Sequence, residues 1–108
     1  MKTTLDEKNK LLTVWLSGDL TSTNADALRA KLTEVLEPTM GKPPGWQQLR
    51  LDLPAAKMVD SVGLNLVVTI LRAVQKVGGK MSVRYRNPNV LRTFEFTRLV
   101  QHIEMVKA

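Results

Sequence analysis

Short stretches with apolar residues at every second position alternate along this chain with longer stretches whose apolar residues recur every three or four positions. The first spacing is typical of β-strands, and the second is typical of amphipathic helices. A helix between two strands usually serves as the crossover connection that brings both strands into one parallel sheet. The alternation therefore predicts an α/β fold with a mostly parallel sheet.

The strand pattern predicts a sheet of four to five strands. In the first clear segment Leu12, Val14 and Leu16 share one face, and Gly18 follows the segment. A shorter segment lies before it, across a polar turn, so we expect an antiparallel edge strand at the N-terminal end of the sheet. The predicted strands lie around residues 3–8, 11–17, 48–53, 80–86 and 103–106.

The helix pattern predicts about three helices. The best-defined one follows Asp60 and Ser61 and ends at Gly78, and an earlier one starts among residues 21–26 and ends before Pro38. A short third helix is expected behind a capping asparagine and an N1 proline. The residues that carry these helix predictions are Ala25, Leu28, Leu32, Val35 and Leu36, then Gly63, Leu66, Val67, Ile70, Leu71, Val74 and Val77, and finally Asn87, Pro88, Val90, Leu91 and Phe94.

The composition indicates one globular domain over residues 1–108. Of the residues 44% are hydrophobic and 24% are charged, and a chain of this length can bury a real core. The absence of cysteine excludes a disulfide framework and a thiolate metal site. No signal-peptide pattern or apolar run of ~18 residues is present, so we expect a cytoplasmic protein without membrane insertion. The net charge of +6 favours acidic partners.

Two strand-to-helix junctions carry the candidate functional residues, at residues 18–23 and 60–64. Ser61 lies in the first turn of the best-defined helix, and Gly63 nearby leaves its hydroxyl accessible to another protein. A phosphate there would add about −1.5 to −2 charges at a helix start, where an anion is accepted. The competing interpretation is that Asp60 and Ser61 only cap the helix.

A series of short motifs extends from about Leu11 to Met105. In this order they resemble the STAS family, and within it the small anti-sigma factor antagonists. The motifs are Gly18-Asp19-Leu20, Leu51-Asp52-Leu53, Asp60-Ser61-Val62-Gly63-Leu64, Gly78-Gly79-Lys80-Met81 and Asn87-Pro88-Asn89-Val90-Leu91, with Phe94 and Leu99 at further matching positions.

The resemblance implies a STAS fold and a partner switch. Family members bind an anti-sigma factor that is also a serine kinase, and this binding releases a sigma factor. The kinase phosphorylates the serine after the motif aspartate, which ends the binding, and a metal-dependent phosphatase reverses the modification. By position this serine is Ser61, and the antagonist itself needs no cofactor. The implied partner surface comprises Asp19, Thr21, Ser22, Asp60, Ser61, Val62 and Gly63. Leu64 and Val68 lie off the main apolar stripe of the helix and next to Ser61, so they are interpreted either as the apolar part of this surface or as residues buried by neighbouring elements.

A second hypothesis is a STAS scaffold or accessory subunit that is not phosphorylated, for instance in a stressosome-like assembly or beside a lipid-transport ATPase. Ser61 would then only cap its helix. A homodimer is open under both hypotheses. Trp46, next to a proline pair, is interpreted either as packed onto the sheet edge or as an exposed recognition residue.

Enzymatic chemistry is not expected. The single histidine, His102, lies far along the chain, and the glycine that a nucleophile elbow has two residues before its serine is missing before Ser61. Asp19, Asp52 and Asp60 follow strand ends, but the adjacent acidic pair and the late lysine of a receiver domain are missing.

Nucleic acid is not expected as a partner either. Tyr85 shares the inward strand phase of Met81 and Val83, so it is not interleaved with the basic residues on one accessible face. The basic residues of this half are interpreted as a solvated charged face, and they are Arg84, Arg86, Arg92 and Arg98.

Overall fold

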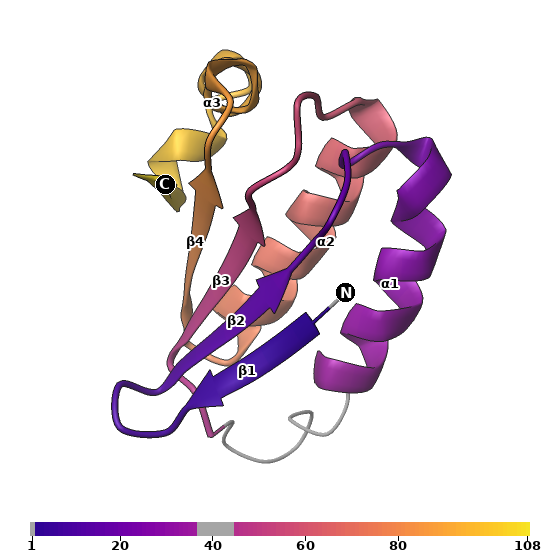
Figure 1. The fold of residues 1–108 in the computed structure, drawn as a ribbon. Helices are drawn as coiled ribbons and strands as arrows, with labels where there is room; N and C mark the ends of the chain where they lie inside the picture. Colours follow the sequence, from indigo (N-terminus) through magenta and orange to yellow (C-terminus); the bar gives the residue numbers. More distant parts are fainter. Residues whose placement is uncertain (1, 37–44) are drawn as a thin grey trace.

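In the computed structural model, which describes residues 2–36 and 45–108, five strands form one mixed sheet (Figure 1). The strand order follows the chain, and only the first pair is antiparallel. This confirms the predicted α/β fold with an antiparallel N-terminal edge strand. The strands are β1 (Lys2–Asp6), β2 (Leu11–Trp15), β3 (Gln48–Leu53), β4 (Lys80–Tyr85) and β5 (Ile103–Lys107).

Three α-helices connect the strands in the described residues. The two longer ones, α1 (Ser22–Leu36) and α2 (Ser61–Lys76), lie side by side against one face of the sheet (Figure 1). The short helix α3 (Pro88–Phe96) lies beyond the carboxyl end of β4, and a 3-10 turn, η2 (Leu99–Gln101), leads back to β5.

The core lies between the sheet and the two long helices. The alternating apolar residues of the strands are buried on the helix-covered face, as predicted for Leu12, Val14 and Leu51. The predicted stripe of α2 is also confirmed, except that Val77 at its end is only half-buried. On α1 the predicted residues Ala25, Leu28 and Leu32 are buried, whereas the side chains of Val35 and Leu36 lie outside the described residues.

The helix ends follow the predicted local signals. The Asn87 side chain accepts a hydrogen bond from the Asn89 N–H, and Pro88 occupies the first turn of α3. After α2 the chain turns at Gly78, whose φ of +75° is a conformation that glycine adopts without strain.

Trp46 is buried, with 4% of its surface exposed, so it is packed and is not an exposed recognition residue. Its ring lies against the backbone at Gly79, where an added Cβ would stand 3.1 Å from a ring carbon. Most of the predicted loop from Pro38 to Trp46 lies outside the described residues.

Candidate partner-binding site

The loops that follow β2 and β3 lie side by side at the carboxyl edge of the sheet. Adjacent parallel strands end at the same edge, so the loops that leave them meet there. Leu20 forms an isolated parallel bridge with Val59. The Leu20 N–H donates to the Met58 carbonyl over 3.2 Å, and the Asp60 N–H donates to the Leu20 carbonyl over 3.1 Å. The two predicted strand-to-helix junctions, at residues 18–23 and 60–64, are therefore joined by backbone hydrogen bonds into one site.

Asp60 joins the first turns of two helices. Its backbone is extended, as usual for an N-cap, and its Oδ1 accepts from the Gly63 N–H over 2.8 Å. Its Oδ2 accepts from the Ser22 N–H at the start of α1 over 2.9 Å. These hydrogen bonds, that from Gly63 first, lower the pKa of the Asp60 carboxyl because they stabilise its charged form.

Asp19 fixes the two loops at a second point. Its Oδ1 accepts from the Lys57 N–H over 2.7 Å, and its backbone carbonyl accepts from the Asn24 side chain over 2.7 Å. The carbonyl of Thr21 accepts from the N–H groups of Asn24 and Ala25 at the start of α1. The polar groups of this loop are thus largely engaged in holding the helix start in place.

The interpretation of Gly63 as a residue that opens access to Ser61 is wrong. Gly63 is buried, and a Cβ there would stand only 2.1 Å from the carbonyl oxygen of Leu20. Glycine is therefore required because the neighbouring loop approaches the backbone of α2, and Gly63 presents no side chain to a partner.

Ser61 is exposed at the first position of α2. Among the described residues its hydroxyl has no hydrogen-bond partner, because the capping function belongs to the preceding carboxylate of Asp60. A macromolecule can therefore reach the hydroxyl without displacing another side chain.

An open apolar groove of about 560 Å³ begins at Ser61. Val62 in its wall is exposed, whereas Leu64 and Val68 are half-buried. The opposite wall comes from Thr97, directly after α3, and from Leu99 at the start of η2, which are distant from α2 in the sequence. The groove is lined by Ser61, Val62, Leu64, Val68, Thr97 and Leu99, together with Asn65.

The predicted site residues form two groups. Asp19, Thr21 and Ser22 belong to the loop before α1 and to its first turn. The second group lies at the start of α2, and Asp60 hydrogen-bonds both helix starts. The motifs did not indicate Thr97 as part of this site, because it approaches α2 only through the path of the chain after α3.

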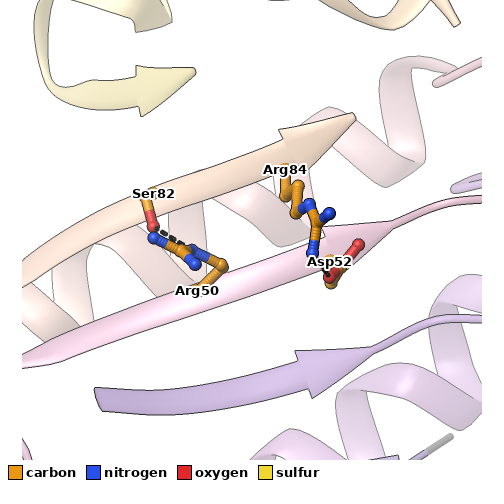
Figure 2. Close-up of polar contacts among 4 residues, drawn as sticks. All are labelled: Arg50, Asp52, Ser82 and Arg84. Atoms are coloured by element: carbon orange, nitrogen blue, oxygen red, sulfur yellow. Dashed lines mark hydrogen bonds and ion pairs between the residues drawn. The ribbon is translucent and has the colours of Figure 1, made fainter. Parts of the chain in front are cut away.

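Asp52 does not belong to this site. It lies on the face of the sheet opposite α1 and α2, where its carboxylate is 3.6 Å from the Arg84 guanidinium (Figure 2). On the same face, Nε of Arg50 donates to the Ser82 hydroxyl over 3.3 Å (Figure 2).

Across the described ranges 2–36 and 45–108, no three acidic, histidine or cysteine side chains gather in a way that could hold a metal ion.

Comparison with known protein families identifies the family of this chain. The family model of the STAS domain matches residues 2–108. The chain belongs to the STAS family. Among proteins related to this STAS chain is BtrV of Bordetella bronchiseptica, whose name gives it the proposed role of anti-sigma factor antagonist. BtrV is 28% identical over 97 residues, which are 90% of this chain and 78% of BtrV.

Solved STAS structures show the same fold. A Thermotoga maritima protein, TM1081, described as a proposed anti-sigma factor antagonist, matches with a TM-score of 0.82 and 18% identity, covering 99% of this chain and 86% of TM1081. The anti-sigma factor antagonist SpoIIAA of Bacillus, in its unphosphorylated form, matches with a TM-score of 0.73 and 20% identity over 99% of this chain and 88% of SpoIIAA.

No helix in the described part of this STAS protein is long and apolar enough to cross a membrane.

Proposed function

We propose that this STAS protein is an anti-sigma factor antagonist that binds a serine-kinase anti-sigma factor and is released when that kinase phosphorylates Ser61. The observation that carries the proposal is the exposed Ser61 hydroxyl, at the start of α2 and at the wall of an apolar groove. The names of BtrV and SpoIIAA support the same role.

The proposed switch is the phosphorylation of Ser61, which adds negative charge to this surface. The kinase moves the γ-phosphoryl group of ATP to the Ser61 oxygen, whose proton is released, and ADP leaves. A metal-dependent phosphatase later hydrolyses the phosphoester with water. The ATP and metal ions belong to these two enzymes.

The phosphate is tolerated by the antagonist and not by its partner. It adds about −1.5 to −2 charges at the first turn of α2, where the helix dipole favours an anion. In the interface the same charge would lie against desolvated or acidic partner groups. Such contacts cost several kcal/mol, and each ~1.4 kcal/mol weakens binding tenfold. We therefore expect binding to weaken by at least about 100-fold.

The first test asks whether Ser61 accepts phosphate. The protein is incubated with Mg-ATP and a candidate serine-kinase anti-sigma factor from the same organism, and its intact mass is measured. We expect one added phosphoryl group on the wild type and on Ser17→Ala, and none on Ser61→Ala. Ser17 is the control because it is also an exposed serine and lies outside the predicted partner surface.

The second test asks whether the charge ends the binding. Phosphorylated protein and the Ser61→Asp variant should lose affinity for the unmodified kinase, whereas Ser61→Ala should keep it. Equal affinity of all four forms would contradict the switch. A wild type that accepts no phosphate from the kinase but still assembles with other STAS proteins would favour the scaffold hypothesis.

A further inference from the structure

Strand β1 forms one edge of the sheet, with β2 on its inner side (Figure 1). Within the described residues, no strand pairs with its outer side, and the backbone N–H and C=O groups that point outward there have no hydrogen-bond partner. Such an edge is a template for pairing with a further strand unless a feature of the sequence blocks it.

Neither a proline nor a bulge protects the edge of β1. Its five residues, Lys2–Asp6, include no proline, so every one of them keeps its N–H group. They pair with β2 in an unbroken register, from Lys2 opposite Trp15 to Asp6 opposite Leu11, so no bulge twists the edge away. The outer side of β1 is therefore able to continue the sheet.

The sequence of β1 is complementary to itself in the antiparallel direction. When Thr4 lies opposite Thr4 of a second copy, Lys2 lies opposite Asp6 of that copy, and Asp6 lies opposite its Lys2. Residues opposite each other in an antiparallel pair have their side chains on one face, where opposite charges stabilise the pairing. Every other antiparallel register of these five residues loses both charge pairs, because Lys2 and Asp6 meet only when Thr4 is central.

Both charged side chains of β1 are placed for these contacts. The Asp6 carboxylate accepts hydrogen bonds from the side chain and the N–H of Asn9 and from the N–H of Lys8, and these bonds lower its pKa by stabilising the charged form. Its two oxygens offer about four acceptor positions, so one remains for an ammonium group. Nζ of Lys2 lies 5.7 Å from the centre of the Trp15 ring on β2, on the same face of β1 as Asp6.

The other face of β1 is open as well. Leu5 lies opposite Leu12 of β2 and shares its face, yet Leu5 is 44% exposed whereas Leu12 is 7% exposed. The layer formed by α1 and α2 therefore does not extend over β1, and it leaves room for a second copy beside this strand. In the register centred on Thr4, Leu5 lies opposite the exposed Thr3 of the second copy, so pairing covers part of both side chains.

The opposite edge of the sheet lacks this complementarity. In β5 the two charged residues, Glu104 and Lys107, are three positions apart, so their side chains point to opposite faces. Residues paired across two antiparallel strands share a face. No antiparallel register of β5 with a second β5 therefore brings these two charges together, and the charge pattern favours β1 as the pairing edge.

We propose that two copies of this protein pair through their β1 strands, antiparallel and centred on Thr4, so that their sheets become one continuous sheet. The inference goes beyond the proposed function and does not depend on it. Five residue pairs form a small interface, so we expect a weak, concentration-dependent dimer.

The first test uses the absence of cysteine from the chain, because a single introduced cysteine then reports the register. In the proposed dimer the two copies of residue 4 have Cα atoms about 4.5–5.5 Å apart, which a disulfide can bridge. Thr4→Cys should therefore form a disulfide-linked dimer under mild oxidation, measured by non-reducing electrophoresis. Thr3→Cys is the matched control, because Thr3 is also exposed on β1 and its two copies would be about 8 Å apart, too far for a disulfide.

The second test measures the dissociation constant of the dimer by sedimentation equilibrium in about 0.15 M salt. Lys2→Glu should raise this constant about fivefold or more, because it places like charges opposite each other at both ends of the pair. Lys107→Glu is the control, since it makes the same charge change on the other edge strand and should alter the constant less than about twofold. The thermal midpoint of each variant shows that it is folded.

Three results would overturn the dimer. They are a wild type that stays monomeric up to about 1 mM, cross-linking of Thr3→Cys as readily as Thr4→Cys, and a Lys2→Glu variant that associates like the wild type. None of these measurements involves the kinase, so each of them leaves the proposed switch at Ser61 standing. A Ser61 that accepts no phosphate overturns that switch and leaves the dimer unaffected.

Discussion

The carboxylate of Asp60 accepts hydrogen bonds from the first turns of two different helices, through the N–H groups of Ser22 and Gly63. A cap usually serves only the helix that follows it. Here the same side chain also fixes the start of α1 relative to Ser61. Removal of the Asp60 carboxylate should therefore weaken the attachment of both helix starts, and with it both groups of site residues.

The pH dependence of stability should show this role. Hydrogen bonds from Gly63 and Ser22 hold the pKa of Asp60 below its ordinary value of 3.8 in the folded protein. The carboxylate therefore stabilises the fold at a pH above that value, and the contribution is lost as the pH falls through the lowered pKa. We expect the urea midpoint of the wild type to fall more between about pH 6 and pH 3 than that of Asp60→Asn, since an amide does not titrate. An equal fall of the urea midpoint with pH in the wild type and in Asp60→Asn would contradict this role of Asp60.

Gly63 gives a sharper steric prediction. Gly63→Ala should destabilise the protein by about 2 kcal/mol or more, because its Cβ would meet the Leu20 carbonyl at 2.1 Å and a backbone must move. Gly45→Ala is the control, since its Cβ would meet only the Leu5 side chain, at 3.9 Å. Chemical denaturation distinguishes the two, and equal stabilities would argue against the close approach of the loops.

Helix α3 divides its two phenylalanines between the core and the surface. Phe94→Ala should cost about 3–5 kcal/mol, because it empties a site that is fully buried. Phe96→Ala should change stability by less than about 0.5 kcal/mol, because its side chain is 91% exposed. Urea unfolding of both variants checks this, and a large loss for Phe96→Ala would place its ring in a packed environment.

The helices and strands could be predicted because their signals are local. The spacing of Leu66, Val67 and Ile70 identifies the buried side of α2, and Asn87 with Pro88 identifies the start of α3. The order of these elements was enough to predict a mostly parallel sheet with one antiparallel edge.

The contacts that complete the site could not be predicted in the same way. The bond from Ser22 to Asp60 joins residues 38 positions apart, and any residue with a backbone N–H could supply it. Thr97 reaches the groove only through the path of the chain after α3, for which no spacing rule exists. Gly63 was misinterpreted because a glycine in a motif does not show whether it serves a partner or a neighbouring backbone.

The net charge of +6 is a property of the entire chain, and it should act on the rate of encounter with an acidic partner. Raising the salt concentration from about 0.05 M to about 0.5 M shortens the range of this attraction several-fold. We expect the association rate with the kinase to fall with salt and the dissociation rate to change much less. Stopped-flow measurements test this, and a salt-independent association rate would contradict it.

The identical order of the strands in the sheet and along the chain has a consequence for biosynthesis. By the time Lys76 has left the ribosome, β1, β2, β3 and both long helices are available to one another. The remaining strands, β4 and then β5, add successively at a single growing edge. No strand has to be inserted between two that are already paired, so we expect the nascent protein to assemble progressively during translation.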